Sequence, residues 1–291
     1  MSRIKNTIIG VAAALLMFTL PGCSSVRLAY NNASQLAWWW VDSYLDFSRE
    51  QAPAARQAID RLLDWHRATQ LTEYIPLLVA AQAQVAEPTT PALACRWQDQ
   101  VRDKLEPSLQ RALAQAAELV PGLAEPQFKA LEKRYTKGND EMREEFMQAD
   151  VAERQAESVK RALERAERLY GRLGDAQKRV VKEGVAASPF NPELWLRERQ
   201  RRQRETVQTL RRLVADKADA DQRLAALRGL VAHTERSPDA EYRVYQVKLN
   251  DYNCVFAAQL HNATSAAQRL KARETLKGWE EDLRALIAGT S

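Results

Sequence analysis

Apolar side chains recur every three or four residues through most of this 291-residue chain, and this pattern limits what the chain can fold into. Steps of three and four place side chains on one face of an α-helix, whereas a β-strand needs alternation at every second residue. Strand-like alternation is absent, and the chain has only 10 glycines. The sequence therefore predicts an all-α protein, an elongated bundle of several helices.

The longest periodic segment runs from about residue 125 to residue 170. Its apolar positions keep steps of three and four, and they continue in register across Lys137-Gly138-Asn139. We therefore expect one continuous helix over 125–170, which would span roughly 65–70 Å at 1.5 Å per residue. Residues 171–190 read as a break with a short helix inside it, and they are the point at which the domain could divide.

The N-terminal segment has the three parts of a bacterial secretion signal. Arg3 and Lys5 give a basic start, Thr7 to Leu20 is an apolar run without a charge, and Leu20-Pro21-Gly22-Cys23 ends it. The run is too short for a membrane-spanning helix, which needs about 20 apolar residues, but it suits a secretory signal. A leucine three residues before a cysteine, and a small residue directly before it, are typical of a lipoprotein acylation site.

We therefore expect removal of residues 1–22, lipid attachment at Cys23, and a helical domain over 23–291 that faces the periplasm. Ser24 stands where aspartate would retain a lipoprotein in the inner membrane. The periplasmic face of the outer membrane is thus favoured over the inner membrane, with more than one acyl chain giving a durable anchor. The alternative is a plain signal peptide, or an uncleaved anchor, with a chance cysteine.

The remaining cysteines, Cys95 and Cys254, would lie in an oxidising compartment, which favours a disulfide between them. The alternative is two separate half-buried thiols, because nothing in the sequence shows that their backbones meet. The three histidines, His66, His233 and His261, have no ligand spacing with these cysteines. Lone histidines of this kind are usually structural, so we expect no metal and no cofactor.

The segment from Val26 to Phe47 is rich in aromatic residues. On a helix, Trp40 lies on the apolar face, while Trp38 and Trp39 point to either side of it. One interpretation is a hydrophobic helix within the bundle core, and the other is an interfacial belt beside the lipid, since indole rings favour the head-group region. The core interpretation is favoured, because two aspartates interrupt the stretch and no basic flank accompanies it.

Residues 197–206 contain no apolar side chain but five arginines. These arginines are Arg197, Arg199, Arg201, Arg202 and Arg204. They could bind an anionic partner, such as lipid head groups or phosphates. They could equally form a solvated face held by pairs such as Glu198 with Arg202, and this second interpretation is favoured because glutamates and glutamines dilute the charge.

Four short segments share a helix start followed by a glutamine. Ser48-x-x-Gln51 and Ser265-x-x-Gln268 have a hydroxyl at the cap, as in a capping box. Leu123-Ala124-Glu125-Pro126-Gln127 and Leu173-Gly174-Asp175-Ala176-Gln177 have the same outline without the hydroxyl. The pattern resembles the LTxxQ signature of the periplasmic Spy and CpxP stress proteins, which are small and cradle-shaped. This resemblance implies a chaperone-like role.

A second resemblance covers essentially the whole chain. Its residues are the cysteine motif at 20–23, Tyr30-Asn31-Asn32, the tryptophan-rich helix ending in Asp42-x-Tyr44-x-Asp46, the segment Ser188-Pro189-Phe190-Asn191-Pro192-Glu193-Leu194-Trp195, and Leu260-His261-Asn262. Together they look like a family of proteobacterial lipoproteins of unknown function. The resemblance implies a lipid-anchored helical protein and supplies no catalytic residues.

Catalytic patterns are missing from the sequence: it has no G-x-S-x-G, no H-E-x-x-H and no phosphate-binding P-loop. The net charge of the chain is +5 and falls by two when the signal peptide is removed. A charge of this size does not require a nucleic-acid partner. We expect a non-enzymatic binding, structural or adaptor protein with a protein partner in the cell envelope. The alternatives are a Spy-like periplasmic chaperone and a hydrolase whose site is not visible in the sequence.

Overall fold

The computed structural model describes residues 25–289, which fold into helices and contain no strand. The helices are α2 (Ser25–Asn31), α3 (Ala33–Leu45), α4 (Ala52–Trp65), α5 (Leu71–Gln84), α6 (Pro91–Leu119), α7 (Glu125–Phe146), α8 (Val151–Tyr170), α9 (Asp175–Ala186), α10 (Pro192–Ala215), α11 (Ala220–Glu235), α12 (Ala240–Asn262) and α13 (Ala266–Ala288). The prediction of an all-α helical bundle is confirmed. The expected signal peptide, Cys23 and Ser24 lie outside the described residues.

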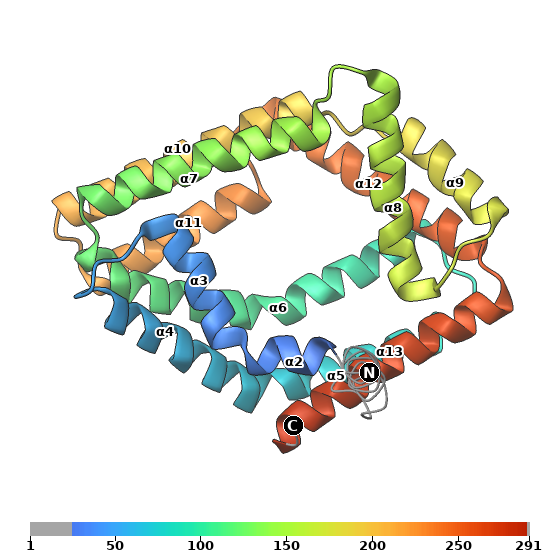
Figure 1. Ribbon diagram of the computed structural model, residues 1–291, viewed down its shortest axis with the longest axis horizontal. Helices are drawn as coiled ribbons and strands as arrows, with labels where there is room; N and C mark the ends of the chain where they lie inside the picture. Colours follow the sequence, from blue (N-terminus) through green and yellow to red (C-terminus); the bar gives the residue numbers. More distant parts are fainter. Residues whose placement is uncertain (1–24, 290–291) are drawn as a thin grey trace, which may run out of the picture.

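The helices are laid around a closed circuit (Figure 1). α7 and α10 run side by side along one edge, and α8, α9 and α12 form one end. α5 lies in the first third of the chain and packs along α13, the last helix. α2 also contacts α13. Elements far apart in the sequence therefore meet to close the circuit. None of the helices within 25–289 has the length and apolar character that crossing a membrane needs.

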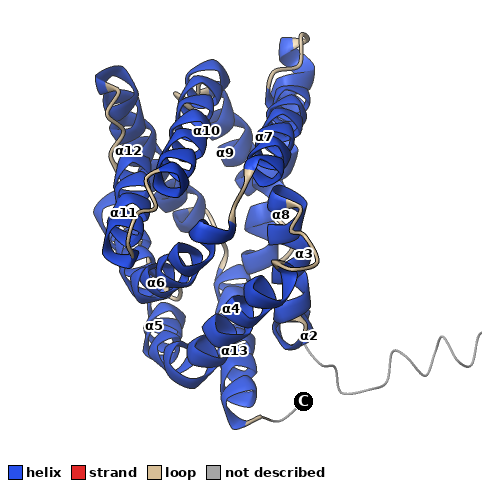
Figure 2. Cartoon of the chain, turned by 90° about the vertical axis from the view of Figure 1, so that its left-hand side faces the viewer, coloured by secondary structure: helices blue, strands red, loops and turns tan. Residues whose placement is uncertain are grey.

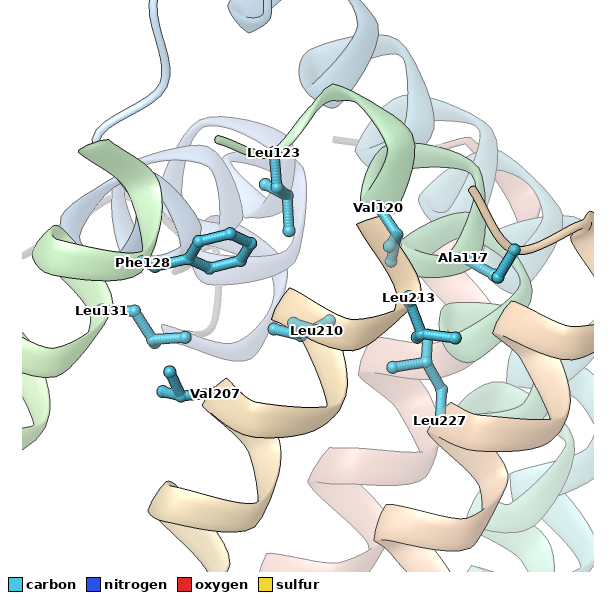
Figure 3. Close-up of a cluster of buried hydrophobic side chains, with 10 residues drawn as sticks. Ala117, Val120, Leu123, Phe128, Leu131, Val207, Leu210, Leu213 and Leu227 are labelled. Atoms are coloured by element: carbon cyan, nitrogen blue, oxygen red, sulfur yellow. The ribbon is translucent and has the colours of Figure 1, made fainter. Parts of the chain in front are cut away.

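The hydrophobic core is divided into three clusters. The largest joins α6, α7, α10 and α11, and Figure 3 shows Phe128 and Leu131 of α7 facing Val207 and Leu210 of α10. A second cluster lies between α8, α9 and α12, and a third between α5 and α13. Burying one such side chain stabilises the fold by about 1.5–3 kcal/mol. Tyr170 of α8 packs against both the second and the third cluster, so these two adjoin.

The segment 125–170 is divided into two helices, so the prediction of one continuous helix there is wrong. Residues 147–150 separate α7 from α8. Asp150 Oδ1 accepts hydrogen bonds from the backbone N–H of Ala152 at 2.8 Å and of Glu153 at 3.4 Å. An aspartate in this position satisfies the free N–H groups of a new helix start, which favours a break over continuation.

The longest helical runs lie elsewhere in the chain. α4 and α5 form one run over 52–84, joined by a π-helical turn at His66–Gln70. α6 continues into a short 3-10 turn, Val120–Gly122. α7 does pass without interruption through Gly138, as its periodicity predicted. A very long helix is thus present, but at a different place.

Two helix starts meet in what we call the first glutamine junction. It is built by Gln51, which directly precedes α4, and Gln127 in the first turn of α7. Each side-chain oxygen accepts the backbone N–H three residues earlier, at 2.8 Å and 3.1 Å respectively. Each side-chain nitrogen donates to a carbonyl in the loop before the other helix: Gln51 to Gly122 at 2.5 Å, and Gln127 to Asp46 at 3.2 Å. The two helices therefore cap each other.

The second glutamine junction repeats this arrangement between α9 and α13. The side-chain oxygens of Gln177 and Gln268 each accept the N–H three residues earlier, at 2.9 Å in both cases. The side-chain nitrogen of Gln177 donates to Ala263 O at 2.6 Å, and that of Gln268 to Arg172 O at 3.1 Å. All four of these glutamines thus link helices that are distant in sequence.

We predict that Gln177→Ala lowers the free energy of unfolding by about 2–4 kcal/mol, because it leaves the N–H of Gly174 and the carbonyl of Ala263 without these partners. Gln222 is the matched control: its oxygen accepts the N–H of Asp219 at 3.0 Å, but its side chain is exposed. Gln222→Ala should cost only about 0.5–1.5 kcal/mol. Urea unfolding followed by circular dichroism measures both, and equal losses would contradict the role of the junction.

Candidate functional site

The five arginines at 197–204 lie on α10, and several have partners inside the chain. Arg197 Nη2 lies 2.6 Å from Glu241 Oε2 on α12. Arg199 Nε donates to Asn139 Oδ1 on α7 at 3.0 Å, across the α7–α10 contact. Arg204 is exposed. Arg197 and Arg199 therefore tie α10 to α12 and α7 instead of offering their charge to a ligand.

The other two arginines bind a buried carboxylate, and Glu198, Arg201, Arg202 and Glu205 together are called the Glu198 cluster. Glu198 is only 2 % exposed. Its oxygens accept from Arg201 Nε at 2.8 Å, Arg201 Nη2 at 2.9 Å and Arg202 Nε at 2.8 Å. Arg201 Nη1 also donates to Glu205 Oε2 at 2.7 Å. The expected pair of Glu198 with Arg202 is therefore present, but in a half-buried network and not on a solvated face.

The network fixes the charge of its central carboxylate. Burial alone would raise the pKa of the Glu198 carboxyl, but hydrogen bonds from Arg201, Arg202 and Ser237 hold it below its ordinary value. Ser237 is fully buried just before α12. A carboxylate that accepts from two guanidinium groups has little basicity left for proton abstraction. The cluster thus braces α10 and, through Ser237, links it to the segment before α12, and its carboxylate is unsuited to proton abstraction.

A hollow of about 620 Å³ lies where α8, α9, α12 and the segment before α10 meet. Three arginines of α8 line it, namely Arg154, Arg161 and Arg165, and we call it the arginine hollow. Their spacing of seven and four residues places them on one face of the helix. Glu193 is the one acidic residue among its lining residues. The starts of α8 and α10 also line the hollow, and helix N-termini carry partial positive charge.

Phe146 and Phe190 line the arginine hollow, and Trp195 packs against both rings. Phe146, Phe190 and Trp195 contact one another edge to face, with centroid distances of 5.4–5.9 Å. The guanidinium of Arg161 lies 4.4 Å from the centre of the Phe146 ring, a cation–π contact. Arg161 Nε lies 3.8 Å from Glu145, so this arginine is partly neutralised. The site therefore combines positive charge with apolar surface, a combination that suits an anionic group with an apolar neighbour.

The far wall of the arginine hollow depends on close packing of α9 against α12. A Cβ on Gly184 would lie 2.4 Å from the ring of Phe256, so only glycine fits there. Tyr252 donates its hydroxyl to Gly184 O at 2.6 Å, and burial raises the pKa of this tyrosine. Sequence reasoning missed the hollow because it treated α8 as the continuation of one long helix. The signal that could have found it is the spacing of arginines on α8 beside the motif at 188–195.

Two of the histidines, His66 and His261, make hydrogen bonds that hold parts of the fold together. His66 lies between the hydroxyls of Tyr30 and Tyr74, at 2.7 Å and 3.1 Å. His261 Nε2 donates to Glu87 O at 2.8 Å, and its Nδ1 accepts from Tyr170 at 2.8 Å. Burial lowers the pKa of both imidazoles and raises that of Tyr170 to about 12. The motif at 30–32 therefore joins α2 to the turn between α4 and α5, and the motif at 260–262 joins α12 to the loop after α5.

Cys95 and Cys254 are brought together as a disulfide between α6 and α12, with Cα atoms 5.3 Å apart. Beside it, Gln98 Nε2 donates to Asn250 Oδ1 at 2.7 Å. The bond closes a sequence separation of 159 residues. In the chain-entropy description, a loop of this length corresponds to a stabilisation of about 5 kcal/mol. The disulfide therefore fixes α12, which forms one wall of the arginine hollow.

We predict that Glu198→Gln lowers the free energy of unfolding at pH 7 by about 3 kcal/mol, because it leaves two half-buried arginines without their carboxylate. The pKa of Glu198 is lower in the folded chain than in the unfolded chain. Its contribution is therefore complete above the unfolded pKa of about 4.3 and is lost as the pH falls through the folded value. The difference between wild type and variant should accordingly narrow in acid.

Chemical denaturation at a series of pH values measures this difference. Glu144→Gln, at an exposed position of α7, is the control and should change stability by less than about 0.5 kcal/mol at every pH. A Glu198→Gln penalty that stayed constant down to the acid limit of folding would show that the ionised carboxylate is not what stabilises the cluster.

Comparison with known proteins places the chain in a group without an assigned activity. Residues 43–243, more than half of the chain, match a family described as "Family of unknown function (DUF6279)". The match includes all of α4 to α11 and therefore the arginines of α8 and α10. No curated protein and no solved structure matches the chain. On the extent of this match, the chain belongs to the DUF6279 family, whose function is unknown.

Proposed function

We propose that the protein is a lipid-anchored, non-enzymatic adaptor of the cell envelope that binds an acidic segment of an envelope partner. The observation that carries the proposal is the arginine hollow, in which three arginines of α8 stand beside an aromatic group and one glutamate. Arginine forks match carboxylates, and the rings offer apolar contact to neighbouring side chains. Acidic and aromatic residues in one short segment are therefore the chemistry that fits.

Three features support the proposed location. The motif at 20–23 is typical of an acylated cysteine, and Ser24 favours the periplasmic face of the outer membrane over the inner membrane. The disulfide between Cys95 and Cys254 suits an oxidising compartment. The resemblance to proteobacterial lipoproteins of unknown function points to the same place. The lipid would hold the arginine hollow near envelope partners and raise its effective concentration for them.

The experiment measures binding of two synthetic peptides to the full chain by fluorescence anisotropy. One peptide alternates glutamate with phenylalanine, and the other alternates glutamine with phenylalanine. We predict tighter binding of the acidic peptide, and a loss of about tenfold or more when Arg154→Glu and Arg165→Glu are combined, since each reverses a charge in the hollow.

Arg204→Glu is the matched control, because Arg204 is an exposed arginine outside the hollow. It should leave the affinity unchanged, and added salt should weaken binding to the wild-type chain. Equal binding of both peptides, or an equal loss with Arg204→Glu, would contradict the proposal.

A Spy-like chaperone is the second candidate, and a specific observation favours it. Val101 and Leu105 on α6, and Val244 and Val247 on α12, are all exposed. The disulfide between these helices and the bond from Gln98 to Asn250 hold α6 beside α12 at the point where they meet. Exposed apolar side chains of this kind suit an unfolded client. The LTxxQ-like glutamines add the resemblance to Spy and CpxP.

Suppression of the aggregation of an unfolded client at near-stoichiometric amounts tests the chaperone candidate. Val244→Ser with Val247→Ser should abolish suppression, because apolar contact with the client is lost. Val79→Ser, at an exposed valine of α5, should leave it unchanged. A chain that does not suppress aggregation, or variants that all suppress it equally, would exclude Val244 and Val247 as a client site.

A further inference from the structure

The first two helices of the described chain expose large apolar side chains. Trp39 is 60 % exposed and Trp40 64 %, and Leu36 on the same helix is 46 % exposed. Positions 36, 39 and 40 are three and four residues apart, so they form one face of α3. Leu28 on α2 is exposed as well. Figure 2 shows α2 and α3 at one side of the molecule. We call this surface the tryptophan face.

The orientation of the tryptophan face is fixed by the opposite side of α3. Trp38 is 6 % exposed, stacks on Phe47 at 5.9 Å, and lies beneath the guanidinium of Arg56 at 4.0 Å. Because Trp38 is held inside, α3 cannot turn to bury its two neighbours. The expectation that this segment belongs to the core is thus correct for Trp38 and wrong for Trp39 and Trp40.

On α3, the tryptophan face carries no charged side chain. The other exposed positions of α3 are Gln35 and Ser43, and its one charged residue, Asp42, is half-buried. The side chain of Asp42 accepts the backbone N–H of Phe47 at 3.1 Å. Elsewhere the surface is rich in Lys, Arg, Asp and Glu, which make up 28 % of the chain. An uncharged face with two indoles is the composition that membrane interfaces favour.

Its place in the chain puts this face next to the proposed membrane attachment. α2 begins at Ser25, directly after the cysteine motif and its apolar run Thr7 to Leu20. Trp39 follows Cys23 by 16 residues, which span at most about 24 Å when helical. A chain attached to a membrane at this end would thus hold the tryptophan face within reach of the head groups. This holds whether Cys23 is acylated or the apolar run itself is retained.

We propose that the tryptophan face docks on the lipid surface, with the indoles of Trp39 and Trp40 in the head-group region. Docking adds a second contact to the N-terminal attachment and so fixes the orientation of the helical domain. Such a weak face becomes effective because the attachment supplies a high local concentration of membrane. This inference rests on the proposed membrane attachment at the N-terminus, and it is independent of what the arginine hollow binds.

The test places the full chain in vesicles of phosphatidylcholine with brominated acyl chains, which quench nearby indoles. We predict quenching of the wild-type chain and loss of most of it in the double variant Trp39→Phe with Trp40→Phe. Trp279→Phe is the matched control, since Trp279 is 40 % exposed but lies on α13. This variant should leave the quenching by the brominated lipid unchanged. High salt should have no effect, because the face is uncharged.

Two results would overturn the proposal. Quenching that persists in the Trp39→Phe, Trp40→Phe chain would place other tryptophans at the lipid. An absence of quenching in the wild-type chain, together with tryptophan emission that depends on protein concentration, would assign the face to a second copy of the chain. Both variants replace exposed rings with rings, so their circular dichroism and urea midpoints should match the wild type and exclude misfolding as the cause.

Discussion

The structure depends on four glutamine side chains, which act in two pairs. Each pair supplies hydrogen-bond partners to the backbone groups at two helix starts. Each helix leaves N–H groups without partners at its first turn, and each preceding loop leaves carbonyls in the same state. Gln51 and Gln127 cap α4 and α7 and hold each other's loops, and Gln177 and Gln268 do the same for α9 and α13. With the core divided into three clusters, these junctions and the disulfide add polar and covalent links between helices that are distant in sequence.

Local features of the fold were predictable from the sequence, whereas its tertiary pairings were not. Apolar periodicity gave the helices, and the four glutamine segments marked helix starts, because both signals lie within one or two turns. Which glutamine faces which loop depends on residues more than seventy positions apart, for which the sequence carries no local signal. The break before Asp150 was missed because the apolar pattern continues on both sides, so the cap alone separates α7 from α8.

Charge composition was a poor guide to the candidate site. The arginine-rich stretch of α10 allowed a binding interpretation beside the favoured solvated face, yet Arg201 and Arg202 bind the buried Glu198, and Arg197 binds Glu241. The arginine hollow draws its charge from α8, where three arginines are spread over three turns and look unremarkable in sequence. Ion pairs inside the chain remove charge from its surface, so arginine counts predict a binding surface only when the partners are known. The aromatic residues of the tryptophan face, in contrast, stay at the surface, because Trp39 and Trp40 are exposed and only Trp38 is buried.

The most direct test of this account is a double-mutant cycle across the first glutamine junction. Gln51 Nε2 lies 3.3 Å from Gln127 Oε1, and each also holds the other's loop. Changing both to alanine should give a coupling energy of about 0.5–3 kcal/mol in urea unfolding, whereas Gln51 and Gln177, in different junctions, should be additive within about 0.5 kcal/mol. Additivity of Gln51 with Gln127 would contradict the claim that reciprocal capping joins these helices.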